Sequence, residues 1–524
     1  MILFYNGIID SPQSKATALA VDGSRIIAIG SDAEILNLAK AGSEKINLHS
    51  KTIWPGLIDS HHHFEMFSQS LSQVKCETDS IDQCLSLVKQ KAQSIPNGEW
   101  IVGQGWNQNT WGTFPTASQL DSVTQDHPAF LADKSIHAAW VNTKALSLAG
   151  INSKIPDPVG GAIQHDHTGE PTGILFENAV SLVESYIPSP TESQILTWMS
   201  EGQKELHRLG LTGIHDFDHA SCFAVLQTMQ QKGELSLRVT KSIPVESLDE
   251  AIKMGLKTGF GNEQLQIGSV KLFADGALGP QTAAMLTPYE NTTSEMGTLL
   301  LTADEIFEIG MKATGHGLSL AIHAIGDRAT NQVLNGLAMV RQFEITHELI
   351  QQLQRIEHLQ LLHPDDLQKV RDLSIVASMQ PIHIISDMFT ADKHWGKRSR
   401  LAYAFASLLK QETSLIFGSD APVESPNPFL GIRAAITRRR INGDPHQNGW
   451  YPEEKISIDQ AKRAYSEVPS RISGRGNQFG KLKPGMLADL IILANNPADV
   501  DPDELVNLAP EKVMVNGTWV FDLR

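Results

Sequence analysis

Short apolar runs recur through the middle of this chain, and stretches with helical periodicity separate several of them. The runs cover residues 53–60, 210–217, 235–244, 267–275, 318–324, 354–359, 374–380 and 414–420. The interval from Ala329 to Val340 shows apolar residues at helical spacing. Strands that alternate with helices predict an α/β fold, here a (β/α)8 TIM barrel. The alternative is a doubly wound sheet, which usually has a glycine-rich turn after its first strand, where this chain has three histidines.

The two ends of the chain are β-rich instead. Residues 1–52 contain short strand-like runs with an Asp22-Gly23 turn, and residues 478–524 contain the hairpin dipeptide Asn516-Gly517. Neither end has enough strands to bury a core alone. We therefore predict that 1–52 and 478–524 form one small composite β-sandwich domain, which flanks a barrel of residues 53–477.

A long interval between the first apolar run and the second interrupts the regular alternation of predicted strands and helices. It predicts an insertion over residues 64–205, with aromatic and polar segments of the kind that build substrate pockets. Trp106 and His137 from this insertion, and Gln380 at the end of the seventh run, are candidate substrate-binding residues. Core packing is an equal alternative for Trp106, and hydrogen bonds within the loops are an equal alternative for His137 and Gln380.

Histidines stand at the end of the first run. His61 and His63 are two residues apart in an extended segment, so both imidazoles fall on one face while His62 points away. Neutral imidazole is the commonest metal ligand in proteins. An accidental histidine cluster is the alternative, but this cluster lies inside an apolar run and not at a terminus. The spacing favours half of a metal site.

His323, His358 and Asp420 end three later runs. A lone histidine is usually structural, and an aspartate there can simply cap the next helix. Because the carboxyl ends of barrel strands meet at one face, these residues together with His61 and His63 predict one metal centre. In such a centre Asp420 could bind metal and also accept a proton from water, as a general base does.

Lys271 lies inside an apolar run, where an ammonium group without a partner is costly to bury. One solution is a salt bridge with Asp275 or another carboxylate. The other is carboxylation of the amine by CO2, which would turn Lys271 into an anionic oxygen ligand that bridges two metals. The residues alone favour the second only slightly.

Charge and cysteine content narrow the class of protein. The chain has 524 residues, 41% of them hydrophobic, and its 43 basic and 59 acidic residues leave a net charge of −16. This negative net charge argues against sequence-independent binding to nucleic acid or to anionic lipid. We expect no membrane span, no signal peptide and a cytoplasmic location. The three scattered cysteines, Cys76, Cys84 and Cys222, predict reduced thiols.

Several motifs in order resemble those of the amidohydrolase superfamily of metal-dependent hydrolases, and within it the subgroup that includes N-substituted formamide deformylase. The motifs are Pro55-Gly-Leu-Ile-Asp-Ser-His-His-His63, Val270-Lys-Leu-Phe-Ala-Asp-Gly-Ala-Leu-Gly279, His323-Ala-Ile-Gly-Asp-Arg328, Arg355-Ile-Glu-His-Leu359, Ser378-Met-Gln-Pro-Ile-His383, Phe417-Gly-Ser-Asp-Ala-Pro-Val423 and Gly480-Lys-Leu-Lys-Pro-Gly-Met-Leu-Ala-Asp-Leu490.

The resemblance implies one or two divalent metal ions, with zinc favoured. His61 and His63 would bind the more buried metal, and His323 and His358 would hold the second. Lys271, as N6-carboxylysine, would bridge the two metals. Asp420 would bind metal and act as the catalytic base.

We therefore predict a metal-dependent amidohydrolase that uses metal-activated water to hydrolyse a non-peptide carbon–nitrogen bond in a small molecule, either a linear amide or an N-substituted formamide. The alternatives are esterase, lactonase or deaminase activity on the same site, or a metal-binding regulatory protein without turnover. Asp420 argues against the last, because structural metal sites need no proton acceptor. A homodimer is compatible with the sequence, which leaves the oligomeric state open.

Overall fold

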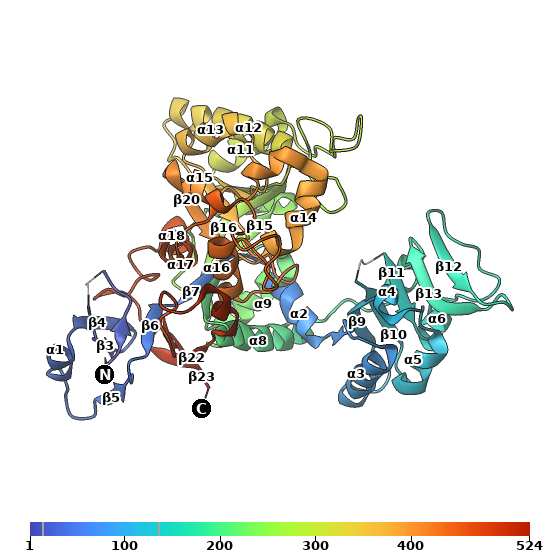
Figure 1. Cartoon of the computed structure of the whole chain (residues 1–524), viewed down its shortest axis with the longest axis horizontal. Coiled ribbons are helices and arrows are strands. Elements are labelled where there is room, and N and C mark those ends of the chain that lie inside the picture. Colours follow the sequence, from blue (N-terminus) through green and yellow to red (C-terminus); the bar gives the residue numbers. More distant parts are fainter. Residues whose placement is uncertain (13–14, 135–136, 524) are drawn as a thin grey trace. The chain divides into compact units, whose positions relative to one another are not determined.

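The computed structural model describes residues 1–12, 15–134 and 137–523. The chain forms two compact units, one of Met1–Ser68 with Leu196–Arg524 and the other of Gln69–Ile195 (Figure 1). The second unit falls within residues 64–205, where the sequence predicts an insertion.

Eight parallel strands in the first unit confirm the predicted barrel. Each strand pairs with the next one along the sheet. In chain order they are β7 (Leu57–His62), β14 (Leu211–Asp216), β15 (Arg238–Pro244), β16 (Leu265–Phe273), β17 (Leu320–Ala324), β18 (Arg355–His358), β19 (Val376–Met379) and β20 (Ser414–Phe417).

The first and last barrel strands meet at residues predicted to bind metal. The backbone N–H of Asp420 donates to the carbonyl of His61 at 2.7 Å, and the N–H of His63 donates to the carbonyl of Ala421 at 3.0 Å. Gly418 permits this approach, because a Cβ at that position would lie 2.4 Å from the backbone nitrogen of His61. Closure of the barrel therefore brings His61 and Asp420 together.

Helices follow the strands around the barrel and cover its outer surface. They are α9 (Ala220–Gln231), α10 (Leu248–Lys253), α11 (Ala303–Thr314), α12 (Asp327–Thr346), α13 (Leu367–Asp372), α14 (His383–Trp395), α15 (Phe405–Lys410), α16 (Pro428–Thr437), α17 (Ile458–Ala464) and α18 (Glu467–Ile472). The helix α8 (Glu192–Arg208) leads into β14. The 20 residues of α12 include the stretch in which the sequence shows helical spacing.

Two further sheets are built from the ends of the chain, the first from N-terminal strands alone and the second from strands of both ends. One has the order β4-β3-β1-β5, from Arg25–Gly30, Ala18–Asp22, Ile2–Tyr5 and Glu44–Asn47. The other has the order β2-β6-β21-β22-β23, from Ile8–Ile9, Thr52–Pro55, Leu490–Leu493, Pro510–Val515 and Thr518–Asp522. Phe4, Ile53, Leu490 and Met514 share one hydrophobic core. In Figure 1 the first strands and the last ones lie side by side, as the pairing of β6 with β21 requires.

The first predicted apolar run is divided between two sheets. Its first residues form β6 in a terminal sheet, and the rest form β7 in the barrel. A buried ion pair also connects the barrel to the C-terminal segment. The guanidinium of Arg238 on β15 binds the carboxylate of Asp489 through two nitrogens, one of them at 2.8 Å. Barrel and terminal sheets are thus joined by backbone continuity and by charge.

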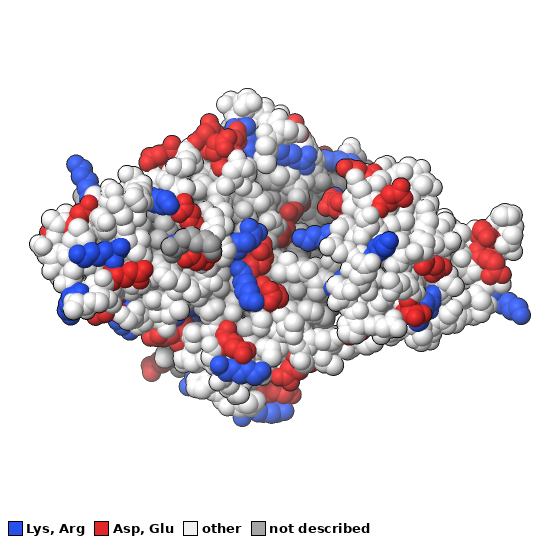
Figure 2. Space-filling view, turned by 90° about the horizontal axis from the view of Figure 1, so that it is seen from below, with Lys and Arg blue, Asp and Glu red and all other residues white. Residues whose placement is uncertain are grey.

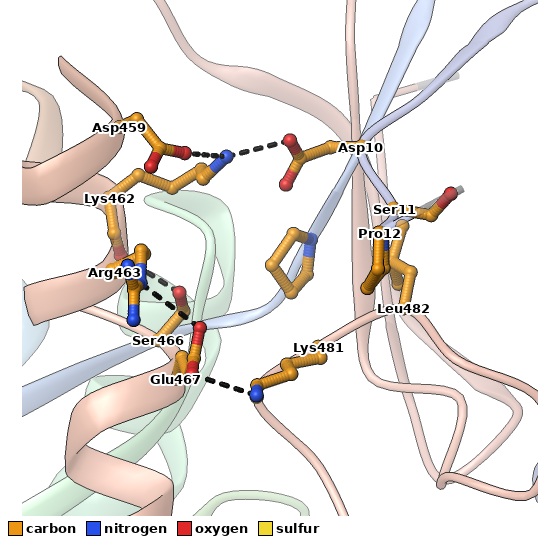
Figure 3. A pocket seen from close by; sticks show the side chains of 12 residues that line it. Asp10, Ser11, Pro12, Asp459, Lys462, Arg463, Ser466, Glu467, Lys481 and Leu482 are labelled. Atoms are coloured by element: carbon orange, nitrogen blue, oxygen red, sulfur yellow. Dashed lines mark hydrogen bonds and ion pairs between the residues drawn. The ribbon is translucent and has the colours of Figure 1, made fainter. Parts of the chain in front are cut away.

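A cavity of about 180 Å³ separates the N-terminal segment from α17 and α18 (Figure 3). Lys462 Nζ lies 2.6 Å from Asp10 and 2.9 Å from Asp459. Glu467 accepts from Arg463 at 3.1 Å and pairs with Lys481 at 2.7 Å. Every charged side chain labelled in Figure 3 therefore has an ionic partner, which is typical of a structural contact between two segments of a fold.

The second unit is built around a six-stranded sheet of order β12-β13-β11-β10-β9-β8. Its strands are Gly161–His165, Pro171–Glu177, Ala138–Val141, Ala129–Asp133, Ile101–Trp106 and Val74–Lys75. The helices α3 (Ile81–Ser94), α5 (Ala117–Thr124) and α6 (Thr143–Leu148) accompany it. Ile101, Leu131 and Trp140 lie in its core. The unit thus has a hydrophobic core of its own.

On the face shown in Figure 2, basic and acidic side chains are intermixed and form no large patch of one charge. All three cysteines are buried and free, as the sequence predicts. Across the described residues, the helices are too short or too polar to cross a bilayer.

Candidate metal centre

Three of the predicted ligands converge at the carboxyl end of the barrel strands. One donor atom each from His61, His358 and Asp420 can be chosen so that all lie within 4.8 Å of one another. His63 belongs to the same cluster, because its Nε2 lies 3.3 Å from Oδ1 of Asp420. The corresponding distance from Nε2 of His61 to Asp420 is 3.4 Å. Two imidazole nitrogens therefore point at one carboxylate oxygen.

The His61 ring is oriented by a buried carboxylate that the sequence analysis did not single out. Nδ1 of His61 donates to Oε2 of Glu357 at 2.6 Å, which leaves Nε2 for the centre. Arg355 in turn binds Glu357 through two nitrogens and donates to the carbonyl of Ser60 at 2.7 Å. Phe217 stacks on His61 with ring centroids 4.2 Å apart. The orientation of His61 is thus fixed from two sides.

His63 is held in the same way by Asp218, which follows β14. Nδ1 of His63 donates to Oδ1 of Asp218 at 3.2 Å, and the other carboxylate oxygen accepts from the backbone of Glu65 at 2.5 Å. Asp218, Asp216 and Cys222 form a second compact group of possible metal donors. A buried cation already balances this group, because Lys241 Nζ lies 3.0 Å from Asp216.

His358 and His323 are oriented by neighbouring loops. Nδ1 of His358 donates to Oε1 of Gln380 at 2.9 Å, so Gln380 holds a predicted ligand. Nε2 of His323 donates to the carbonyl of Gly276 at 2.9 Å, which leaves Nδ1 available. The two rings pack edge to face with centroids 4.6 Å apart.

Lys271 is buried beside this cluster without an ion-pair partner among the described residues. Its Nζ lies 4.8 Å from the ring centre of Phe217 and 4.9 Å from that of Phe273. Of the two solutions for its charge, the salt bridge with Asp275 does not form. The carboxylate of Asp275 instead accepts from the backbone of Ala284, Ile325 and Gly326. These three hydrogen bonds fix the Asp275 side chain against the backbone of the neighbouring loops.

Burial and neighbouring charges set the protonation of the cluster. Burial, reinforced by Lys271, lowers the pKa of His61 to about 4, and burial lowers the pKa of His358 well below its usual range. Burial opposes ionisation of Asp420, but the surrounding histidines hold the pKa of that carboxyl well below its usual range. Two neutral imidazoles and an ionised carboxylate are the protonation states that metal binding requires.

The backbone is strained at two of these residues. His358 has a φ of 70° and Asp420 a φ of 62°, both in the left-handed region. Side chains other than glycine rarely adopt this region, and such residues cluster at functional sites. The turn at each strand end aims the side chain at the shared centre.

The two candidates from the insertion lie in the second compact unit. The Trp106 ring is fully buried, stacks on Trp111 with centroids 6.0 Å apart, and donates from Nε1 to the carbonyl of Leu131 at 2.7 Å. It therefore packs in that unit's core. His137 is exposed, and its Nδ1 lies 3.0 Å from a carboxylate oxygen of Glu177.

Sequence reasoning missed the residues that orient the ligands. Arg355 and Glu357 are two apart on β18, so their shared face could have been inferred from strand alternation. Asp218 and Phe217 follow β14 directly, at the same end of the barrel as the histidines. No local signal links Glu357 to His61, which is 296 positions away.

The donor set fits a divalent metal. Neutral imidazoles whose Nδ1 atoms are engaged, together with an ionised carboxylate, match the ligand chemistry of zinc and related ions. His61, His358 and Asp420 provide this set directly, and His63 joins it once it has lost its proton. Lys271 and His323 stand beside them.

Known proteins share this architecture. Residues 44–521 match the sequence model of a protein family described as "Amidohydrolase family". Protein LONG AFTER FAR-RED 3 of Arabidopsis thaliana is 31% identical over 95% of this chain and 88% of its own length. N-substituted formamide deformylase of Arthrobacter pascens is 26% identical, over 98% and 96%. The crystal structure of an uncharacterized metal-dependent hydrolase from Pyrococcus furiosus superposes with a TM-score of 0.78, at 28% identity, over 95% of this chain and 100% of that one.

Proposed function

Because this chain belongs to the amidohydrolase family, we propose that it hydrolyses a non-peptide carbon–nitrogen bond in a small molecule, with Asp420 as the general base. A linear amide or an N-substituted formamide is the substrate class we favour. The similarity to N-substituted formamide deformylase supports this class. The observation that carries the proposal is the ionised carboxylate of Asp420 among three histidine rings.

We propose that His61, His63, His323, His358 and Asp420 hold one or two divalent metal ions, with zinc favoured. When bound, such an ion makes water acidic enough to attack a carbonyl carbon near neutral pH. Lys271 would join the ligands as N6-carboxylysine. Its environment supports this, because burial, opposed by nearby carboxylates, lowers the pKa of its amine to about 8, and a neutral amine is the form that reacts with CO2.

The protein's own groups would manage the protons. Asp420 is ionised and can accept a proton from the attacking water, since its carboxylate lies where the imidazole nitrogens point. The same carboxyl can then return the proton to the leaving nitrogen. Glu357 and Asp218 would keep the His61 and His63 rings fixed during this transfer.

The test is a panel of amides, N-substituted formamides, ureas and esters, incubated with zinc-loaded protein. We expect hydrolysis of at least one carbon–nitrogen substrate, and we expect Asp420→Asn to lower kcat by on the order of 100-fold or more. Asp459→Asn, which changes a solvent-exposed aspartate, should leave kcat unchanged.

The outcomes separate the candidate functions. Turnover of esters alone would favour the esterase or lactonase alternative. A metal-loaded protein that hydrolyses nothing on the panel, while Asp420→Asn binds metal like the wild type, would refute the enzymatic proposal and favour a regulatory metal protein.

A further inference from the structure

His383 has a buried ring nitrogen without a hydrogen-bond partner. The residue begins α14, directly after the loop that carries Gln380, and only 8% of it is exposed. Its Nε2 contacts no donor or acceptor among the described residues. A buried polar atom left unpaired costs free energy, and such atoms are rare in folded proteins. We therefore expect Nε2 of His383 to have a hydrogen-bond partner when the protein performs its function.

The imidazole lies beside the proposed metal centre. Its ring is nearly parallel to that of His358, with an interplanar angle of 16° and centroids 6.4 Å apart. His383 is also one of the histidines whose electrostatic interaction with Asp420 lowers the pKa of that carboxyl. An unpartnered hydrogen-bonding group thus stands next to both a candidate ligand and the candidate base.

The surroundings of His383 hold it in place. Its backbone N–H donates to the carbonyl of Gln380 at 3.1 Å, and Gln380 also orients His358. One turn along α14, the carboxyl of Asp387 accepts from the hydroxyl of Tyr403 at 2.5 Å. Gln360 Nε2 lies 3.4 Å from the same oxygen. The helix start is therefore anchored on both sides.

Other buried histidines of the described residues differ in how their ring nitrogens are paired: both ring nitrogens of His62 and Nε2 of His215 lack a hydrogen-bond partner, like Nε2 of His383, whereas His207 is fully paired. His207 is 2% exposed, and both of its ring nitrogens have partners: the carbonyl of Leu211 at 2.9 Å and the hydroxyl of Ser236 at 2.7 Å. His383 is buried to a similar degree but has a free Nε2. The unpaired nitrogen of His383 is informative because of where the residue lies, with its ring parallel to that of His358 beside the proposed metal centre.

We propose that His383 contacts the substrate, with Nε2 donating a hydrogen bond to the carbonyl oxygen of the bond to be cleaved. This deepens the proposed function and rests on it. A donor fixed there would orient the carbonyl before attack and stabilise the negative charge that develops on its oxygen. After hydrolysis the same nitrogen would donate to an oxygen of the carboxylate product. His383 is thus predicted to recognise substrate and product through one atom.

The experiment compares the zinc-loaded wild type with His383→Phe, His383→Gln and the matched control His207→Gln. Zinc content is measured first, and then the binding of formate and acetate by isothermal titration calorimetry. We expect unchanged zinc content and 10- to 100-fold weaker carboxylate binding in His383→Phe, the loss typical of one hydrogen bond to a charged group. His383→Gln, which keeps a donor, should show a smaller loss. His207→Gln should bind like the wild type.

Activity provides the second measurement. On N-phenylformamide, His383→Phe should lower kcat/KM by 10- to 100-fold, with a larger effect on kcat than on KM, because the contact strengthens as charge develops on the oxygen.

Three results would overturn the inference: wild-type carboxylate affinity in both His383 variants, loss of zinc from them, or failure of the zinc-loaded wild type to bind formate or acetate at all. If the wild type binds formate and His383→Phe does not, but no amide on the panel is hydrolysed, the contact stands and the proposed function fails. If His383→Phe does not fold, His383→Gln decides through its carboxylate affinity.

Discussion

Nδ1 of His61 donates a 2.6 Å hydrogen bond to the carboxylate of Glu357, and neither side chain has more than 1% of its surface exposed. Burial opposes ionisation of Glu357, yet Arg355 and His61 hold the pKa of this carboxyl well below its usual range. An ionised partner fixes the tautomer of His61 and makes its Nε2 a stronger ligand. The carboxylate acts on the centre only through the histidine, which makes Glu357 a positioning residue.

Replacement of Glu357 should therefore weaken metal binding. We expect Glu357→Gln to lower zinc affinity by about 10- to 100-fold, the usual cost of losing a group that orients a metal ligand. Competition with a chelator measures this affinity. Glu344→Gln is the control, since Glu344 is equally buried and pairs with Arg341 at 2.5 Å on α12. Equal zinc affinities in the two variants would contradict the role of Glu357.

Metal binding should release a proton near neutral pH. Burial opposes protonation of His63, but Asp218 and Asp420 raise its pKa to about 10, so the metal-free protein carries a charged His63 at pH 7. Its raised pKa stabilises the metal-free protein fully below about pH 6.5, and this contribution disappears as the pH rises through about 10. Burial keeps His61 and His323 neutral at pH 7, each with a pKa of about 4.

Because a metal must displace the His63 proton, zinc affinity should rise about tenfold per pH unit between pH 6.5 and 9. Isothermal titration in buffers of different ionisation enthalpy counts the proton directly. His63→Asn should abolish the release, and His207→Gln should preserve it. A pH-independent affinity in the wild type would mean that His63 is neutral before metal binds.

Lys271 should acquire a labile mass of about 44 Da in bicarbonate, as expected for a carbamate on its amine. Burial lowers its pKa to about 8, so the reactive neutral amine becomes common as the pH rises from 6 to 9, and the modified fraction should rise with it. Native mass spectrometry measures that fraction. Lys271→Arg should lose the added mass.

Lys241→Arg provides the matched control for this modification. Lys241 is also buried. Burial acts to lower the pKa of its amine, but the carboxylate of Asp216 outweighs this effect and raises the pKa, which keeps the amine charged. The variant should therefore gain mass like the wild type. Modification that persists in Lys271→Arg would place it on another amine.

The buried pair of Arg238 and Asp489 should be a large contributor to stability. Removal of one partner leaves an uncompensated charge in the interior, so we expect Arg238→Met or Asp489→Asn to lower the free energy of unfolding by about 3–5 kcal/mol. Urea denaturation measures the change. Lys204→Met, which removes an exposed pair with Glu201, should change stability little. Comparable losses in both pairs would show that burial of Arg238 is not what matters.

The sequence by itself determined the barrel and the positions of its candidate ligands. Apolar runs at regular intervals specify strands, and parallel strands in a barrel end at one face, so His61, His63, His323, His358 and Asp420 could be assigned to that face from chain position. The β-rich ends likewise indicated strands that needed each other, and Phe4 and Met514 do share a core.

Only the tertiary structure decided which groups surround each ligand. The contact of Glu357 with His61, the packing of Lys271 between two phenylalanine rings and the free nitrogen of His383 all depend on side chains brought together by barrel closure. The same holds for Trp106, whose burial the sequence could not distinguish from a pocket wall. Strand periodicity is a local property, whereas hydrogen bonds and burial between distant segments are set by how the strands and loops pack in three dimensions.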